Sequence, residues 1–302
     1  MGIEETAQDI RSMKIRGAGR IGRFAAAALM WWAQGVLNPD KEAFLSELQK
    51  AAETLRETRP TAISLSNAID LTLRGAQEAE SFHEAQELVI GNAETFIKES
   101  HAAVERIGTL ATSLLETPST ALTICNSSAA ISCLVHCHKA GKLEKVFACE
   151  TRPKGQGFIT VRELAEAEVP VTLIVDSSMY QVMSQVDIVM VGADTVEGDG
   201  SLINKIGTAT LATVARAFGV PVYACAESYK FLPQSRLGSK VEIEERPSEE
   251  ILRAEELPSE VDIFNPVFDR VPPDLRTGII TEHGIIKPEE AETFIRTHLG
   301  GI

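Results

Sequence analysis

The chain has 302 residues, of which 44% are apolar, and its formal net charge at pH 7 is −14. This composition supports a substantial core, and the acidic balance argues against nucleic acid or an anionic membrane surface as the main partner. The N-terminus lacks the pattern of a signal peptide, and the longest apolar run, residues 24–33, is too short to cross a bilayer, so we expect a cytoplasmic protein.

The first glycine-rich stretch, RGAGRIG at residues 16–22, fits the glycine pattern of a dinucleotide-binding loop. That pattern has physical meaning only between a strand and a helix, and residues 3–15 before it show the apolar spacing of a helix. The alternative is a tight backbone turn that carries Arg16, Arg20 and Arg23. We favour this turn, as a cradle for an anion.

Residues 1–115 are predicted to form an all-helical domain. Apolar residues recur at helical spacing in four further segments, which are residues 24–37, 42–58, 62–76 and 82–115. The tripeptide Arg59-Pro60-Thr61 interrupts this pattern between the second and third of them.

From residue 116 onward, short β-prone runs alternate with helical stretches. The predicted strands are residues 121–125, 145–149, 171–175, 187–191, 220–225 and 278–281. This alternation predicts a parallel sheet, and the central runs are apolar on both faces, as in a sheet covered by helices on both sides. The expected fold is therefore an N-terminal all-helical domain, residues 1–115, followed by a Rossmann-like doubly wound parallel sheet in an α/β domain, residues 116–302.

The residues that follow each strand deserve a functional search, because ligands of open α/β sheets bind beyond the carboxyl ends of the strands. Cys125 lies where the first strand turns into a helix that Asn126 or Ser127 could cap. The positive end of the helix dipole favours a thiolate, so Cys125 is a candidate base or nucleophile with a low pKa. The alternative is a buried, inert cysteine.

The other four cysteines are assigned mostly to packing, and the odd total of five predicts a reduced protein without a disulfide framework. His136 and His138 flank Cys137 and invite a metal hypothesis. Adjacent helical residues point in different directions, however, so this spacing rarely holds one ion, and we expect no metal.

Asp194 follows the apolar strand predicted at 187–191, and we expect it to lie in a poorly hydrated pocket. Desolvation raises the pKa of a carboxyl group, which would make Asp194 a candidate neutral general acid. The alternative is an ordinary turn or capping aspartate. Asn204 and Lys205 follow within the same stretch, just before a helix.

Basic residues gather in loop-like segments and form two suggestive clusters. The N-terminal cluster is Arg16 and Arg59, and the C-terminal cluster is Arg152, Lys205 and Lys230. Because guanidinium groups match phosphate oxygens, two anion-binding ends around a Cys/Asp pair predict a small molecule with two phosphates.

Several motifs together resemble a known group. IRGAGRIGR, ETRPTAISLSNA, CNSSAA, ETRPKGQGFIT, VGADTVEGDGSLINKIGT, AESYKF and FNPVFD occur in that order. From about residue 10 to residue 290 the chain resembles the archaeal ribose-1,5-bisphosphate isomerases. These belong to the superfamily of the translation initiation factor 2B α/β/δ subunits and methylthioribose-1-phosphate isomerase.

The resemblance implies roles for individual residues. Cys125 and Asp194 match the catalytic cysteine and aspartate of that group. The matching N-terminal phosphate-binding residues are Arg16, Gly17, Ala18, Gly19 and Arg59. The matching substrate contacts are Arg152, Asn204, Lys205 and Lys230. Relatives commonly carry a histidine immediately before the cysteine, whereas this chain has Ile124.

The resemblance also implies an activity, namely the isomerisation of ribose 1,5-bisphosphate to ribulose 1,5-bisphosphate in the degradation of nucleoside monophosphates such as AMP. It implies no cofactor, and it implies a homo-oligomer, a dimer or a hexamer. Two alternatives stay open: a regulatory subunit of the initiation factor 2B type, and a methylthioribose-1-phosphate isomerase, which would need an apolar slot in place of the second phosphate site.

Overall fold

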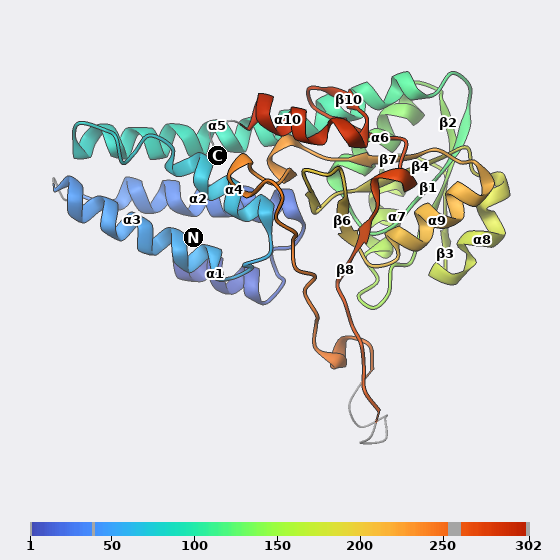
Figure 1. The fold of residues 1–302 in the computed structure, drawn as a ribbon, viewed down its shortest axis with the longest axis horizontal. Coiled ribbons are helices and arrows are strands. Elements are labelled where there is room, and N and C mark those ends of the chain that lie inside the picture. Colours follow the sequence, from blue (N-terminus) through green and yellow to red (C-terminus); the bar gives the residue numbers. More distant parts are fainter. Residues whose placement is uncertain (1, 38–39, 253–260, 300–302) are drawn as a thin grey trace.

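A computed structural model describes residues 2–37, 40–252 and 261–299 of the chain (Figure 1). Within these residues, no helix combines the length and the hydropathy needed to traverse a lipid bilayer. The helices of the N-terminal region and the sheet lie at opposite ends of the long axis of the molecule.

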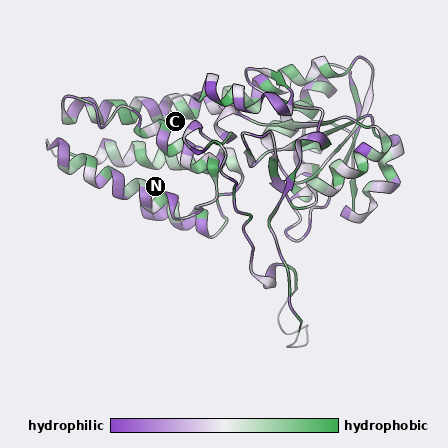
Figure 2. Cartoon of the chain, viewed as in Figure 1, coloured by the Kyte–Doolittle hydropathy of each residue, from purple (hydrophilic) through white to green (hydrophobic). Residues whose placement is uncertain are grey.

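The N-terminal region is helical, as predicted. Its helices are α1 (Ile3–Arg11), α2 (Ala18–Gly35), α3 (Lys41–Arg56), α4 (Ile63–Leu73) and α5 (Phe82–Ala111), followed by a 3₁₀ turn at Thr112–Leu114. The alanines of α2 are mostly buried, and their small side chains let α4 and α5 pack closely against it. Much of α2 is accordingly coloured hydrophobic along its length (Figure 2).

The C-terminal region contains a seven-stranded sheet in the order β10-β9-β7-β4-β1-β2-β3. Its strands are β1 (Ser119–Thr123), β2 (Leu143–Cys149), β3 (Val171–Ile174), β4 (Ile188–Gly192), β7 (Val222–Cys225), β9 (Gly278–Thr281) and β10 (Gly284–Ile286). All neighbouring strands pair in parallel except β10, which is antiparallel to β9. The helices of this region are α6 (Ser128–Lys139), α7 (Gly157–Glu166), α8 (Met179–Val182), α9 (Thr208–Phe218) and α10 (Ala291–His298).

The strand order places a topological switch point between β1 and β4. From β1 the chain proceeds outward to β2 and β3, whereas β4 starts the other half of the sheet, which continues to β7 and β9. In such sheets the crevice outside the carboxyl ends of the two switch strands is where ligands bind. Cys125 follows β1 and Asp194 follows β4, so both candidate catalytic residues lie at this point.

A second, three-stranded antiparallel sheet was not predicted. It consists of β5 (Thr195–Val196), β6 (Leu202–Lys205) and β8 (Phe268–Val271) in the order β5-β6-β8. β5 has only two residues, and β6 (LINK) and β8 (FDRV) carry charged or amide side chains, so no apolar run marks these strands in the sequence. This sheet carries Asn204 and Lys205 at the end of β6.

The expected fold is confirmed, with one correction at the N-terminal glycine motif. The turn predicted for residues 16–22 is limited to Gly17, which has a φ of +89°, and α2 already begins at Ala18. Gly19 and Gly22 therefore lie inside the helix. Close neighbours leave little room for a side chain at these positions, since a Cβ on Gly22 would lie 3.2 Å from the Cβ of Ala68.

Direct hydrogen bonds tie the helical region to the sheet region. The Asn67 side chain on α4 donates to the backbone carbonyls of Tyr229 and Phe231, at 2.9 Å each. The Tyr229 hydroxyl is also 3.0 Å from the Ser100 hydroxyl on α5. These contacts involve the segment after β7, which also carries Lys230, so the docking of the two regions positions a candidate site residue.

Candidate active site

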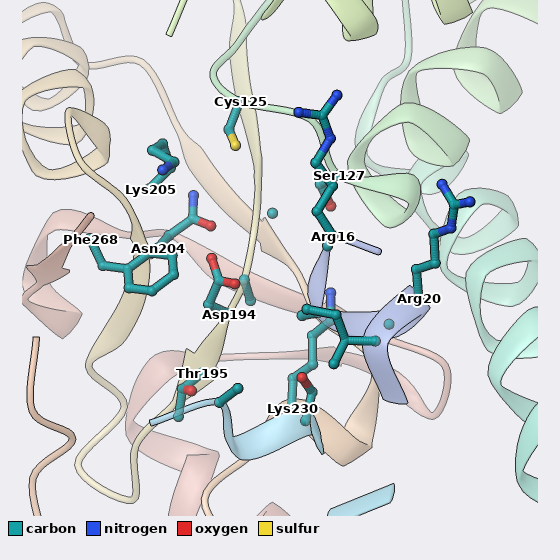
Figure 3. A pocket seen from close by; sticks show the side chains of 18 of the residues that line it. Arg16, Arg20, Cys125, Ser127, Asp194, Thr195, Asn204, Lys205, Lys230 and Phe268 are labelled. Carbon is teal, nitrogen blue, oxygen red and sulfur yellow. The ribbon is translucent and has the colours of Figure 1, made fainter. Parts of the chain in front are cut away.

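A cavity of about 320 Å³ lies at the carboxyl ends of β1 and β4, against the start of α2 (Figure 3). Both regions of the chain line it. The predicted site residues on its wall are Arg16, Gly17, Ala18, Gly19, Arg59, Cys125, Asp194, Asn204, Lys205 and Lys230. Segments far apart in the sequence thus converge on one cavity of a size that suits a small molecule.

Cys125 lies at the wall of this cavity with its sulfur directed into the open space (Figure 3). Its φ of +69° is in the left-handed region, which is uncommon for a residue with a side chain. Burial raises the pKa of the Cys125 thiol to about 11, although Lys205 and Arg16 and a hydrogen bond from the Asn126 backbone act in the opposite direction. The expected low pKa is therefore wrong for the free protein, because desolvation outweighs the helix start.

The pH dependence of alkylation tests this thiol. We expect the rate of Cys125 modification by iodoacetamide to rise about tenfold per pH unit from pH 7 to pH 10, because only the thiolate reacts. The rate should level off only near pH 11. Peptide mapping distinguishes Cys125 from the other four cysteines, which are buried. A plateau at or below pH 8 would contradict the raised pKa.

Asp194 faces the same space from the end of β4 (Figure 3). Its backbone N–H donates to the carbonyl of Ile203 at 3.0 Å, which fixes the residue against β6. Burial raises the pKa of the Asp194 carboxyl, while Lys230, Lys205 and Arg59 oppose the shift. The direction agrees with the sequence prediction, and the proton stays on Asp194 to a higher pH than on an exposed aspartate.

A second buried carboxylate, Glu227, behaves in the opposite way. Burial alone would raise its pKa, but the Lys230 ammonium holds the pKa of Glu227 below its usual value. The two groups form an ion pair at 2.7 Å, and the Tyr229 hydroxyl donates to the other carboxylate oxygen at 3.0 Å. Of the two carboxyls on this cavity wall, Asp194 thus has a raised pKa and Glu227 a lowered one. Such a difference is typical of sites where one carboxyl acts as an acid and the other stays an anion.

Asn204 and Lys205 reach the cavity from β6. Both are buried, and the Asn204 amide donates to the Thr208 hydroxyl at 3.0 Å, which fixes the orientation of its side chain. The positive charge of Lys205 acts to lower the pKa of both Cys125 and Asp194. Its Nζ is also 5.5 Å from the centre of the Phe268 ring.

Two helix starts face the cavity. The first turn of α2 carries Ala18 and Gly19, and no side chain within the described residues caps it. The start of α6 contributes Ser127 and Ser128, and the Ser127 hydroxyl accepts a hydrogen bond from the backbone of Ala130 at 3.4 Å. Backbone N–H groups at a helix N-terminus suit phosphate, so the cavity has a suitable surface for an anion on two sides.

The two predicted basic clusters are arranged differently from the expectation. Arg59 lines the cavity but forms an ion pair with Glu244 at 3.0 Å. Arg152 is exposed, its guanidinium donates to the carbonyl of Ile251 at 3.1 Å, and it is not among the described residues that line the cavity. A substrate contact by Arg152 stays a prediction. The basic residues that line the cavity are Arg16, Arg20, Arg23, Arg59, Lys205 and Lys230.

Sequence reasoning missed Glu227 and Gln156 as members of the site. Gln156 lines the cavity and is buried, and its Oε1 has no hydrogen-bond partner among the residues that the structure describes. The signal was its place in the GQG of the ETRPKGQG motif, after β2. The signal for Glu227 was its position just after the carboxyl end of β7. Within the described part of the chain, no group of His, Cys, Asp and Glu side chains is placed to hold a metal ion.

Comparison with known proteins adds the family context. The model of the Initiation factor 2 subunit family matches residues 14–288. A ribose 1,5-bisphosphate isomerase of Archaeoglobus fulgidus is 45% identical over 298 residues, 99% of this chain and 94% of the relative. Among solved structures, 5-methylthioribose 1-phosphate isomerase from Pyrococcus horikoshii OT3 has a TM-score of 0.81 and 33% identity, covering 98% of this chain and 87% of that one. The translation initiation factor eIF-2B of the same organism has a TM-score of 0.81 and 25% identity, covering 95% and 97%.

Proposed function

The chain belongs to the Initiation factor 2 subunit family, and within it we propose that the chain is an aldose–ketose isomerase that converts ribose 1,5-bisphosphate to ribulose 1,5-bisphosphate. The observation that carries the proposal is the placement of Cys125 and Asp194 at neighbouring strand ends in one cavity. Relatives of that name, 45% and 41% identical over nearly the whole chain, support an isomerase of this kind. We place the reaction in nucleoside monophosphate degradation.

The substrate carries a phosphate at each end, and the cavity offers an anion-binding surface on two sides. We assign one phosphate to the start of α2 with Arg16 and Gly17, and the other to the start of α6 with Ser127 and Ser128. Backbone N–H groups and guanidinium groups both favour phosphate oxygens. The pentose then spans the space between Cys125 and Asp194.

The reaction begins with ring opening. The phosphate on the anomeric carbon prevents spontaneous opening to an aldehyde, so the ring oxygen must be protonated before the bond from C1 to that oxygen breaks. Asp194 supplies this proton, since its raised pKa keeps it in the acid form to higher pH. The electron pair of the broken bond stays on the oxygen, which becomes the C4 hydroxyl, and C1 acquires cationic character.

Proton transfer from C2 completes the isomerisation. The Cys125 thiolate removes the C2 proton, and the electrons of that bond form an enol phosphate between C1 and C2. The thiol then returns a proton to C1 while the C2 hydroxyl gives its proton back to the Asp194 carboxylate. The product is the ketose bisphosphate, and both groups regain their starting states. Lys205, which lies near both groups, favours the thiolate that the step requires.

The two alternatives make different demands on the cavity. A regulatory subunit of an initiation factor acts through its surface and does not require an acid and a base facing one enclosed space. A methylthioribose-1-phosphate isomerase needs an apolar slot in place of one phosphate site, whereas Arg16, Arg20 and Arg59 line this cavity. The charged wall favours the bisphosphate.

A competition assay tests the assignment. We expect purified protein to turn over ribose 1,5-bisphosphate, and we expect methylthioribose 1-phosphate to compete weakly, with a kcat/KM at least about 100-fold lower, because one charge-assisted phosphate site stays empty. Equal rates would contradict the assignment of two phosphate sites. An inert assay together with binding to initiation factor 2 would favour the regulatory subunit.

Assembly and location stay predictions. We expect a homo-oligomer, a dimer or a hexamer, in the cytoplasm, and light scattering coupled to size-exclusion chromatography would measure the mass in solution against the 32.7 kDa of one chain.

A further inference from the structure

The backbone of Cys125 is held on both sides by threonine hydroxyl groups. Its N–H donates to Oγ1 of Thr151 at 2.8 Å, and its carbonyl accepts from Oγ1 of Thr160 at 2.6 Å. Between these two bonds lies a residue with a φ of +69°. For a residue with a Cβ this conformation has a cost in free energy, so the surrounding contacts must maintain it.

Thr151 is fixed independently of the cavity. It is fully buried, and its own φ of +64° is rare for a β-branched residue. Its hydroxyl accepts from Cys125 and donates to the carbonyl of Cys149 at 3.1 Å, while its N–H donates to the Asp176 carboxylate at 2.8 Å. The direction of the hydroxyl lone pair toward Cys125 is therefore set by the end of β2.

Thr160 makes the second half of the clamp from the first turn of α7. It is buried, its hydroxyl proton goes to the carbonyl of Cys125, and its oxygen lies 3.3 Å from the Asn126 amide nitrogen, which donates to it. Neither Thr151 nor Thr160 is among the described residues that line the cavity. Any effect of the two hydroxyls on the reaction must therefore pass through the groups that they contact, which are the peptide of Cys125 and, for Thr160, also the Asn126 side chain.

We propose that Thr151 and Thr160 are positioning residues that hold Cys125 in its left-handed conformation, so that its sulfur points across the cavity toward Asp194 (Figure 3). In this conformation the backbone of Asn126 also forms a hydrogen bond with the sulfur, which favours the thiolate. If either hydroxyl is removed, the peptide can relax toward a commoner conformation and the sulfur moves away from C2. The part of this inference that concerns turnover rests on the proposed function.

The test compares Thr151→Val and Thr160→Val with Thr151→Ser and Thr160→Ser. Valine keeps the shape and the β-branching but loses the hydroxyl, whereas serine keeps the hydroxyl. Thr72→Val is the matched control, because Thr72 is equally buried and its hydroxyl bonds the carbonyl of Ala68 at 2.8 Å, away from the cavity. Circular dichroism and thermal melting show which variants fold.

For each valine variant we expect kcat to fall about 10- to 100-fold with KM changed less than about threefold, because the phosphate sites are intact while the sulfur is displaced. We expect each serine variant to recover most of that loss, and Thr72→Val to match the parent. Alkylation of Cys125 by iodoacetamide at pH 9 should slow at least about threefold in the valine variants, since the sulfur loses its hydrogen bond from Asn126.

Parental kcat and a parental alkylation rate in both valine variants would overturn the clamp. So would equal losses in the serine and valine variants, or a loss in Thr72→Val of the same size, since these indicate a general packing effect. If Thr151→Val does not fold, Thr160→Val decides the matter alone. Alkylation needs no substrate, so it tests the clamp even if the chain fails to isomerise ribose 1,5-bisphosphate.

Discussion

Replacing Cys125 by serine is expected to lower kcat/KM for ribose 1,5-bisphosphate at least about 100-fold, with the fold intact. Serine has nearly the size of cysteine, so the cavity wall is preserved, but its hydroxyl is far more basic when ionised and is protonated at any pH at which the protein is folded. In the serine variant no thiolate is present to remove the proton on C2, so the proposed deprotonation step loses its base.

A cysteine away from the cavity provides the control for this result. Cys137 is fully buried in α6 and lies outside the cavity wall, so Cys137→Ser tests the general cost of placing a hydroxyl in the core. We expect Cys137→Ser to retain parental kcat/KM per folded molecule. Near-parental turnover in Cys125→Ser, measured on folded protein, would exclude Cys125 as the base.

Replacing Asp194 by asparagine is expected to lower kcat/KM by at least about 100-fold as well, because the amide has no acidic proton for the ring oxygen. The nearby carboxyl of Glu227 does not compensate, since its ion pair with Lys230 holds its pKa down and leaves it ionised. The two substitutions therefore remove different steps of one reaction, ring opening and C2 deprotonation.

The pH profile separates the role of Asp194 from a packing effect. In the parent the active form combines the thiolate with the protonated carboxyl, so kcat/KM rises up to the pKa of Asp194 and then stays level until about pH 11, the pKa of Cys125. With asparagine at position 194 only the thiolate titrates, so the residual kcat/KM should keep rising about tenfold per pH unit through the range where the parent is level. The rise should end below pH 11, because the Asp194 charge that helps to raise the pKa of Cys125 is gone. A level profile in Asp194→Asn would contradict the assigned proton transfer.

The sequence was sufficient for elements whose signal is local. Short apolar runs such as residues 188–191 identified the central strands, and helical spacing identified the N-terminal region. The strands β5, β6 and β8 were missed because they are short and no apolar run marks them. The glycines of residues 16–22 suggested a turn, but only Gly17 lies in one, and Gly19 and Gly22 lie inside α2, where neighbouring side chains are close.

The sequence pointed to many residues of the cavity wall, but it did not single out Gln156 or Glu227, and Arg152 does not line the cavity. The strand-end rule predicts that Cys125 and Asp194 share a site, and both line the cavity. The pKa of Cys125 was not predictable, because the burial that raises it depends on the whole cavity wall and exceeds the local effect of the helix start. The contact of Arg152 with Ile251 was equally hidden, since it joins residues 99 positions apart.

The residues proposed for proton transfer and the residues proposed to bind one of the two phosphates lie on different parts of the chain. Cys125 and Asp194 follow two central strands of one sheet, and Ser127 and Ser128 of one proposed phosphate site come directly after Cys125. Arg16 and Gly17 of the other proposed phosphate site belong to the helical region. Substitutions in the helical region can therefore change which group is accepted at one end of the sugar. The residues proposed for proton transfer are then left unchanged. With this division, related enzymes can acquire new substrates through changes in the helical region alone.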